Sequence, residues 1–322
     1  MTDILVMGSN TVDLYVETAA DLIDIDHHNR DDESLLGFQV GDKVLAENVS
    51  FDVGGSGLNA ATAFARTGLE TTYLGCLGDD MFGARILNHF DDENITFRGA
   101  LGDQSGIGII LESDAADRTI LSYKGCNNDL TAADVPDNLS PDWFYSSTVL
   151  GDTRRTMESL IQSFDETTTA INVSSYLADH GINELESILS HTDYLFLNQD
   201  EARRLTGNDD LINMFADLNT VLRGSAIITH GDSGVYYEED RTYYHVPPRP
   251  TNVVETTGAG DAFNAGFVTA KANGRPQHRA VKAGMIQAEH VLEHASTTDD
   301  LLSKQALLDE LNDAEYTTEV IQ

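Results

Sequence analysis

Short β-branched and apolar runs alternate with amphipathic stretches along most of this chain. Runs such as Ile4–Met7, Thr72–Leu77 and Asp193–Leu197 have the length and composition of buried strands. Gly57–Arg66 and Met81–Phe90 are amphipathic and predict helices. This alternation of strand and helix predicts an α/β fold, in which a mostly parallel sheet is flanked by helices on both faces.

Two regions interrupt the alternation. Leu14–Phe51 contains one acidic loop, from Asp21 to Glu33, and two strand-like runs. Ile95–Tyr123 alternates as two or three strands without helices. Such hairpins predict a small β-sheet lid over one large domain that spans residues 1–322, although they could also be edge strands of the main sheet. The expected lid segments are about 12–18, 36–52 and 95–124.

The net charge of the chain limits the classes of molecule that it can be expected to bind. Its 322 residues include 54 Asp and Glu but 19 Lys and Arg, a formal net charge of −35. Hydrophobic residues make up 41%, which is enough for a core and excludes an acidic disordered tail. Nucleic acid is not an expected partner, because phosphate binding needs a basic surface. The spread of acids resembles cytosolic proteins of salt-accumulating halophiles; an ordinary acidic protein and a surface for a basic partner are the alternatives.

Several absences in the sequence bear on location. Only two cysteines occur, so no disulfide framework can form and a reducing compartment is expected. The N-terminal residues MTDILVMG lack the basic and long apolar regions of a secretory signal. No apolar run approaches the roughly 20 residues of a membrane helix. These features predict a cytoplasmic protein without a membrane partner.

The segment Val253–Asp261, VVETTGAGD, has the strongest chemical content. Two glycines flank Ala259, and Asp261 falls in what should be the first turn of a helix. Free backbone N–H groups and the positive dipole end at a helix N-terminus suit a phosphate, and glycine lets the backbone approach it. A carboxylate beside that anion could take a proton from an attacking hydroxyl. The simpler alternative is a glycine-rich turn whose acid favours the helix dipole.

A second segment, Asp52–Gly68, also combines glycines with a polar side chain. Gly54 and Gly55 can bring backbone N–H groups against a polar ligand, and Asn59 can hydrogen-bond hydroxyls from the start of a helix. Alone, this pattern is equally typical of a glycine turn followed by a buried, alanine-rich helix.

Together the two segments resemble the two signatures of the ribokinase/PfkB family of carbohydrate kinases. Four ordered motifs carry the resemblance, and together they span almost the whole chain. The first signature consists of Gly54, Gly55, Asn59, Ala60, Arg66 and Gly68 and continues into Tyr73–Gly83. The other three are NQDEARRLTG at Asn198–Gly207, ITHGDSGV at Ile228–Val235, and ETTGAGDAFNAGF at Glu255–Phe267. A chance match to four ordered motifs is very rare.

The resemblance implies a Rossmann-like, doubly wound domain with a β-sheet lid, Mg-ATP as phosphoryl donor and a hydroxyl group as acceptor. Asp261 matches the catalytic base, and Gly258, Ala259 and Gly260 match the anion hole. Asn198 and Glu201 match the pair that organises Mg²⁺, largely through water. The nucleotide is expected near Thr229, Gly231 and Gly234, and near the helix around Ala280–Ala288. Asp13, Gly54, Gly55 and Asn59 match the residues that hold acceptor hydroxyls; alone, Asp13 could be a solvent-facing strand acid.

Glu255 departs from the family pattern. An aspartate is more usual there, often near a bound potassium ion, and Glu255 with Thr257 is therefore the candidate K⁺ site. The chain also reads His294-Ala295 where relatives often have Gly-Ala.

The acceptor itself stays open. Some relatives that phosphorylate sugar phosphates place a lysine near Lys43, and Arg154 and Arg155 could assist; a surface lysine and an arginine pair at a helix start are the alternative. The candidates are a free sugar or sugar acid of the ribose, fructose or 2-keto-3-deoxygluconate type, a sugar phosphate of the ribose 1-phosphate or fructose 1-phosphate type, and a nucleoside. Exposed lid strands predict a homodimer, as in many relatives.

Two other classes of protein compete with this interpretation. His290, Glu293 and His294 fit H-x-x-E-H, an inverted zinc-peptidase motif. That hypothesis needs a third ligand downstream and leaves both glycine segments unexplained. A binding protein that kept the kinase fold without its activity is the other alternative.

Overall fold

The computed structural model describes residues 2–18, 22–24, 34–36, 40–41, 43–112, 118–137, 139–294 and 301–321. Most of the acidic stretch predicted as a loop, Asp21 to Glu33, lies outside the described residues, as do 37–39 and 42 of the predicted lid. Within the described residues, no helix is long and apolar enough to cross a membrane.

A large mixed sheet forms the centre of the molecule, and seven of its strands run parallel. The last three strands in the chain extend one edge in antiparallel fashion. In spatial order the strands are β16 (Glu319–Val320), β15 (Thr242–Val246), β14 (Val235–Glu239), β13 (Ser225–Thr229), β12 (Tyr194–Asn198), β11 (Thr168–Asn172), β10 (Trp143–Ser146), β1 (Asp3–Met7), β6 (Glu70–Gly78) and β7 (Thr96–Gly102).

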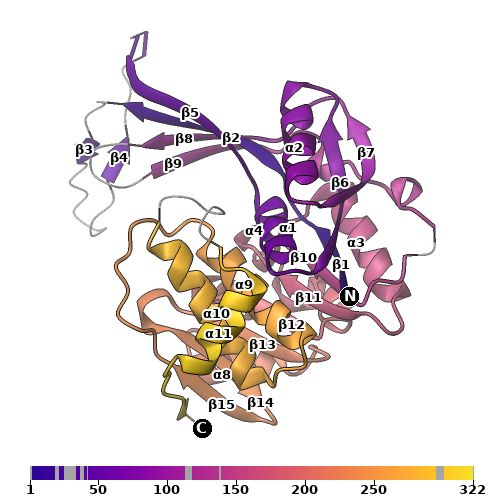
Figure 1. Cartoon of the computed structure of the whole chain (residues 1–322), viewed down its shortest axis with the longest axis vertical. Coiled ribbons are helices and arrows are strands. Elements are labelled where there is room, and N and C mark those ends of the chain that lie inside the picture. Colours follow the sequence, from indigo (N-terminus) through magenta and orange to yellow (C-terminus); the bar gives the residue numbers. More distant parts are fainter. Residues whose placement is uncertain are drawn as a thin grey trace.

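The central strands are apolar on both faces because helices cover both. β1 and β10 are almost continuously buried, which is the pattern of a parallel sheet between two helical layers. One core lies under α1 (Ser56–Arg66), α2 (Met81–Asp92), α9 (Ala259–Ala272), α10 (Gln277–Leu292) and α11 (Lys304–Asp313). The other lies under α3 (Gly151–Ser163), α4 (Ser175–Ala178), α5 (Gly181–Glu184), α6 (Glu186–Leu189), α7 (Gln199–Thr206) and α8 (Leu211–Leu218). The predicted doubly wound α/β fold is confirmed (Figure 1).

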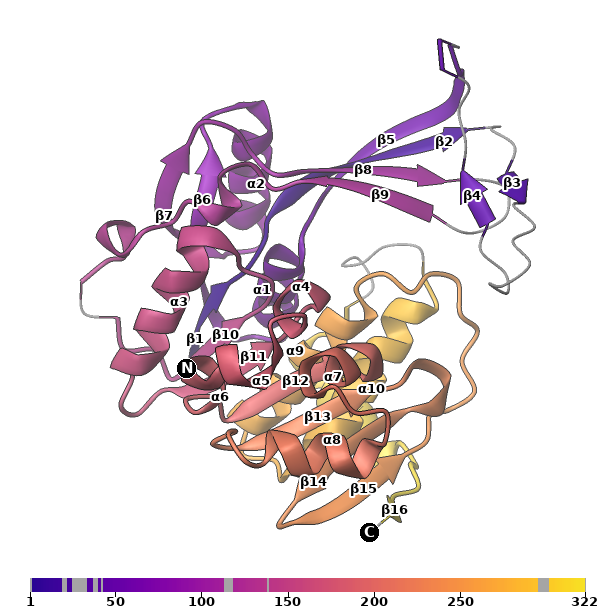
Figure 2. The same ribbon diagram turned by 180° about the vertical axis from the view of Figure 1, so that it is seen from behind.

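A second, four-stranded sheet projects from the main body as a lid (Figures 1 and 2). Its order is β5 (Ala46–Gly54), β2 (Thr11–Thr18), β8 (Ile107–Glu112) and β9 (Arg118–Tyr123). A short pair, β3 (Leu22–Asp24) and β4 (Ser34–Leu36), is separate from it. The predicted small β-sheet is therefore present.

The lid is smaller than predicted at one boundary. β7 pairs in parallel with β6 and is an edge strand of the main sheet, so the expected lid segment 95–124 is wrong in its first part. The lid proper resumes at β8, which pairs with β2. Short alternating strands have the same period at the edge of either sheet, so periodicity could not assign β7.

The buried residue Asn10 holds in place the segment that connects β1 of the main sheet to β2 of the lid. Asn10 lies between β1 and β2, and its backbone N donates to Asn127 Oδ1 (2.9 Å) while its O accepts from Asn127 Nδ2 (2.7 Å). Its side-chain amide donates to Tyr73 Oη (3.0 Å) and to the Cys76 carbonyl (3.1 Å). Tyr73 in turn donates to the Gly8 carbonyl (2.6 Å). The start of β2 is therefore anchored to the main domain on several sides.

Candidate active site

The start of α9 combines a glycine turn with a carboxylate. Gly258 precedes the helix with φ of 80°, a left-handed conformation that glycine adopts without strain. The next N–H groups belong to the first helical turn and lack acceptors within the helix. A side chain at Gly260 would meet no atom within 4 Å, and Gly260 lines two cavities at once. Glycine thus leaves open a space beside the helix N-terminus that an anion would fill.

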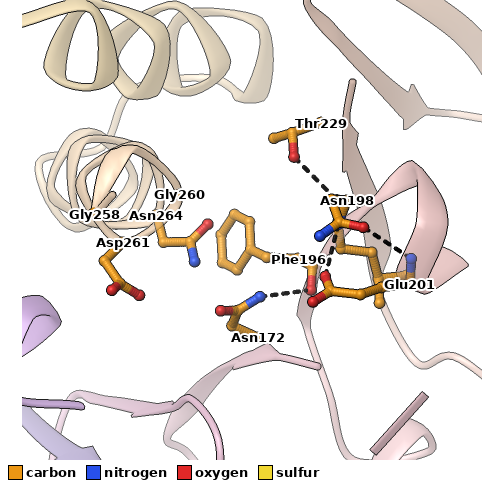
Figure 3. A pocket seen from close by; sticks show the side chains of 10 residues that line it. Asn172, Phe196, Asn198, Glu201, Thr229, Gly258, Gly260, Asp261 and Asn264 are labelled. Atoms are coloured by element: carbon orange, nitrogen blue, oxygen red, sulfur yellow. Dashed lines mark hydrogen bonds between the residues drawn. The ribbon is translucent and has the colours of Figure 1, made fainter. Parts of the chain in front are cut away.

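Asp261 follows Gly260 and faces the smaller of these cavities, about 210 Å³ in volume (Figure 3). Burial raises the pKa of its carboxyl to about 7; the Asn59 amide opposes that shift, and the charge of Glu201 adds to it. A carboxylate with a pKa near neutrality is suited to accept and release a proton at physiological pH.

The opposite side of this cavity carries Asn198 and Glu201 (Figure 3). The two residues cap α7 reciprocally: Asn198 Oδ1 accepts from the Glu201 N–H (2.8 Å), and the Glu201 carboxylate accepts from the Asn198 N–H (2.9 Å). This capping box fixes both side chains at the carboxyl end of β12. Burial raises the pKa of Glu201 to about 7.

Two further asparagines line the cavity and were missed by the sequence interpretation. Asn172 ends β11 and donates to the Phe196 carbonyl (3.2 Å), and Asn264 lies on α9 one turn after Asp261 and donates to Tyr145 Oη (3.0 Å). The described residues contain no group of three or more His, Cys, Asp or Glu arranged for a metal. The amide and carboxylate oxygens nevertheless fit Mg²⁺, which keeps several waters and binds phosphates.

A larger and more apolar cavity of about 540 Å³ adjoins the first at Thr229 and Gly260. Of the residues predicted to contact a nucleotide, Thr229, Gly231, Gly234 and Gly260 line it. Met285 and Ala288 add an apolar wall from α10, the helix expected there. Phe263 and Leu292 complete a surface suited to a flat aromatic ring.

Arg249 and Glu289 line this larger cavity and belong to an ionic cluster that was not predicted. Arg249 Nε donates to Glu289 (2.7 Å), and its terminal nitrogen donates to Glu310 on α11 (2.8 Å). Tyr316 donates to Glu289 (2.9 Å) and lies under the guanidinium, 4.9 Å from ring centroid to Cζ. These contacts join the loop after β15 to α10 and to the C-terminal region.

The predicted acceptor residues meet where β2 and β5 run side by side. Thr11 pairs with Gly54 and donates to Asp13 Oδ1 (2.8 Å). The Asp13 carboxylate lies so close to two glycines that a Cβ on Gly54 would fall 2.2 Å from Oδ2, and one on Gly108 would fall 2.4 Å from Oδ1. Burial is the main cause of the raised Asp13 pKa. Glycine at both positions therefore leaves room for this carboxylate.

Asn59 connects the predicted acceptor residues to Asp261. Gly55 has φ of 96° and lies where a Cβ would be 2.6 Å from the Ser9 carbonyl, so glycine is required at the turn into α1. Asn59, within the first turns of α1, is buried beside Asp261. Among the described residues its Oδ1 has no hydrogen-bond partner, which leaves one acceptor available to a ligand.

The basic residues predicted as anion ligands do not join this group. Lys43 lies in an exposed stretch before β5, and no described hydrogen bond or ion pair ties it to Asp13 or Asn59. Arg154 pairs with Glu158 (3.0 Å) and Glu184 (3.6 Å). Arg155 is exposed and pairs with Asp152. Both arginines are neutralised by carboxylates of their own region.

The candidate potassium residues are close together. Glu255 Oε1 accepts from the backbone N–H groups of Thr256 (2.7 Å) and Thr257 (2.8 Å) and from Thr257 Oγ1 (2.8 Å). This carboxylate thus organises the turn that leads to Gly258. A K⁺ site here stays a prediction.

The histidines of the alternative zinc motif do not converge. His290 Nε2 contacts Glu310 (2.9 Å), while His294 Nδ1 contacts the His290 carbonyl (2.7 Å). Each ring is engaged by a different neighbour, as expected for an ordinary helix.

The comparisons with known proteins identify the family. A model of the pfkB family carbohydrate kinases matches residues 16–304, so the chain belongs to this family. It is a carbohydrate kinase, a phosphotransferase that uses an alcohol group as acceptor. The zinc-peptidase hypothesis is wrong on this evidence.

Relatives and solved structures agree with the family. The ribokinase of Bacillus subtilis (strain 168) is 28% identical over 297 residues, which cover 88% of this chain and 90% of that protein. The ribokinase structure from Thermotoga maritima has a TM-score of 0.80 at 20% identity, covering 97% of this chain and all of that one (100%). The ribokinase of Cryptococcus neoformans var. grubii serotype A, solved in complex with ADP, has a TM-score of 0.74 at 18% identity and covers 96% and 100% of the two chains.

Proposed function

We propose that this protein transfers the γ-phosphate of Mg-ATP to a hydroxyl group of a small carbohydrate. One observation carries the proposal: Asp261 lines the smaller cavity beside Asn59, and its neighbour Gly260 lines both that cavity and the larger one. Family membership supports the class of reaction, and the ADP complex of a related ribokinase supports an adenine nucleotide as donor.

Asp261 has the position and the pKa of the general base. Its carboxylate accepts the hydroxyl proton while the acceptor oxygen forms a bond to the γ-phosphorus. The bond from that phosphorus to the β,γ-bridging oxygen breaks, and ADP leaves with the electron pair. The N–H groups at the start of α9, from Gly258, Ala259 and Gly260 to Asp261, stabilise the negative charge on the transferring phosphoryl group.

The donor side holds the nucleotide and its metal. The base and ribose fit the apolar cavity between Gly231 and Met285, with phosphates directed to Gly260. Asn198 and Glu201 would hold Mg²⁺ through water, where the ion would neutralise charge on the phosphates. Ionised Glu201 is favoured beside such a cation, since an opposite charge lowers a carboxyl pKa.

The acceptor side uses Asp13, Gly54, Gly55 and Asn59. Asp13 accepts hydrogen bonds from two hydroxyls of the sugar, and Gly54 leaves room for that carboxylate. Free sugars of the ribose or fructose type are supported by the ribokinase relatives. Sugar acids, sugar phosphates and nucleosides remain within this proposal because all present adjacent hydroxyls.

The lid supports a homodimer. Its outer strands expose apolar side chains that a small sheet would leave in water: Val49 and Phe51 on β5, and Ile120, Leu121 and Tyr123 on β9. Pairing of two lids would bury these residues and would satisfy open strand edges.

The test is consumption of Mg-ATP in concentrated KCl with a panel of acceptors. The panel contains ribose, fructose, 2-keto-3-deoxygluconate, ribose 1-phosphate, fructose 1-phosphate and nucleosides. One strong acceptor that is lost in Asp261→Ala would establish transfer at this site. A folded protein that transfers to none of them would contradict the proposal and favour a binding role.

A further inference from the structure

Lys124 occupies a fixed position at the base of the lid. It directly follows β9 and precedes a short 3₁₀ turn, η1 (Gly125–Asn128). Asn127 Nδ2 donates both to the Lys124 carbonyl (2.8 Å) and to the Asn10 carbonyl (2.7 Å). Asn10 precedes Asp13 by three residues. The Lys124 backbone is therefore tied to the segment that delivers Asp13.

The Lys124 side chain lies between the lid and α4. Its Nζ is 5.3 Å from the centroid of the Tyr176 ring, and Tyr176 is 56% exposed. Figures 1 and 2 show α4 beside α1, at the edge of the main domain that faces the lid. Lys124 is half-buried, and the negative charge of Asp13 acts on it. The cation thus belongs to the same side of the molecule as the acceptor residues.

Lys124 and Asp13 nevertheless form no ion pair within 4.0 Å. Desolvation lowers the Lys124 pKa, while Asp13 raises it. A half-buried ammonium without a bonded carboxylate is costly, because water is lost and no anion replaces it. A ligand with a negative group beside its hydroxyls would contact both side chains and offset that cost.

The scarcity of cations makes this arrangement informative. The chain has five lysines and a net charge of −35, so its overall field repels anions. Lys43 is exposed, Lys282 donates to the Tyr316 carbonyl (3.1 Å), and Lys271 lies over Tyr194 at the far end of α9. An anionic acceptor would therefore need a local cation. Ile107 on β8 pairs with both Val12 and Tyr123, so only one strand lies between the backbones that lead to Asp13 and Lys124.

We propose that Lys124, backed by Tyr176, is an anion subsite of the acceptor pocket, so that the preferred acceptor carries a carboxylate or phosphate in addition to its hydroxyls. This inference rests on the proposed function and narrows its substrate class to sugar acids and sugar phosphates. It also assigns to Lys124 the role that the sequence suggested for Lys43.

The experiment compares matched acceptors with and without the anion. Fructose is paired with fructose 1-phosphate and ribose with ribose 1-phosphate, while 2-keto-3-deoxygluconate tests a carboxylate. We expect kcat/KM of the wild-type enzyme to favour one anionic class by roughly 10- to 100-fold, the value of a hydrogen bond to a charged group. Lys124→Met should remove most of that preference, mainly through KM, and Lys124→Arg should retain much of it.

Lys271→Met is the matched control. It also removes an ammonium that lies over a tyrosine ring, 5.5 Å from the Tyr194 centroid, but near the C-terminal end of α9. We expect it to leave the ratio of anionic to neutral acceptors unchanged. If both methionine variants lowered that ratio equally, net charge rather than a subsite would be responsible, and the inference would be overturned.

A binding measurement separates this inference from the proposed function. Calorimetry on Asp261→Asn, with and without Lys124→Met, measures affinity for the anionic acceptor without turnover; we expect a roughly 10- to 100-fold loss from Lys124→Met. Asp261-dependent transfer to neutral sugars alone would overturn the anion subsite and leave the kinase intact. Absence of Asp261-dependent transfer with every acceptor would overturn the proposed function, whatever the binding result.

Discussion

The two sheets of this molecule differ in how far their strands are buried. The main sheet is covered on both faces, and its central strands β1 and β10 are almost continuously buried. The lid sheet has one strand, β5, whose first seven residues are all exposed. The two cavities proposed for the donor are built from the buried sheet and the helices on it, whereas Asp13, the proposed acceptor carboxylate, is carried on the exposed one. Under the proposed function, the donor site is therefore part of the packed main domain, whereas Asp13 of the acceptor site lies on the more exposed lid sheet.

This contrast predicts where mutations will act. Changes on the donor side should alter chemistry without altering acceptor affinity, since Asp261 and its neighbours are set by packing in the main domain. Changes in the lid should alter acceptor affinity and association of subunits while leaving nucleotide binding unchanged. Each prediction below could break or sharpen that division.

The largest effect is expected from Asp261→Asn. Removal of the base should lower kcat by about 10²- to 10⁴-fold, with little change in KM for ATP or in the unfolding temperature. Steady-state kinetics and a thermal melt measure this. The control is Asp152→Asn, which changes an exposed acid in the first turn of α3, also behind a glycine of positive φ. A kcat within tenfold of wild type would remove Asp261 from the reaction.

Asp13→Asn should act on the acceptor alone. Loss of a charged hydrogen-bond acceptor should raise KM for the sugar by roughly 100-fold and leave KM for ATP unchanged. The matched control is Asp52→Asn, because Asp52 lies directly opposite Asp13 on β5 and accepts from its neighbour Val53 (2.8 Å). If ATP binding fell instead, the assignment of the two sides of the site would be reversed.

Leu121→Glu should weaken a lid-mediated dimer by roughly 30-fold, because the charge would be buried against a second copy. Sedimentation across a concentration series measures the dissociation constant. Leu101→Glu is the control, since Leu101 is 60% exposed but lies on β7 of the main sheet, and Leu121 is 54% exposed on β9. A monomeric wild-type protein at every concentration would refute the dimer.

The pH profile should show an acidic limb from the base. Burial raises the Asp261 pKa to about 7, so the ionised, proton-accepting form decreases as the pH falls below that value. We expect kcat/KM to drop about tenfold per pH unit on this limb. Initial rates between pH 5 and 9 in one buffer series test it, with the unfolding temperature as control for stability. A flat profile down to about pH 5 would contradict a base with this pKa.

Salt should have the smallest effect. Molar KCl screens repulsion among the acidic residues, because the Debye length falls to about 3 Å. We expect the thermal midpoint to rise by the order of 5 °C between dilute and concentrated KCl. The same experiment in an isotonic sucrose series controls for general stabilisation. An unchanged midpoint would argue against a halophilic adaptation.

More of the proposed donor side than of the acceptor side could be predicted from the sequence. The alternation of strands and helices predicted the main sheet, and the glycines around Ala259 predicted a helix start, which α9 confirms; the anion hole there stays a prediction. Asn172 was missed although it ends a parallel strand, and polar residues at the carboxyl ends of such strands meet at one edge. That argument, applied to β11, could have found it.

The strands of the lid were harder to predict from the sequence, for a physical reason. β7 and β8 are both short strands, and only the partner strand decides which sheet each one joins. The sequence around Lys124 did not indicate a role for it either, since the link between its backbone and the segment before Asp13 depends on Asn127 and Asn10, which are more than a hundred residues apart in the chain. Long-range hydrogen bonds of this kind cannot be deduced from periodicity.

Because Asn10 is anchored to the main domain, it would act as the pivot point of any rigid rotation of the lid. If the lid swings, the residues nearest this anchor move least and the far tips of β2 and β5 move most. Asp13 is three residues beyond Asn10, which is roughly 10 Å of extended chain, and Lys124 is held by the same Asn127 amide. Asp13 and Lys124 would therefore keep their mutual spacing at any lid angle, while the far ends of β2 and β5 move over the proposed site.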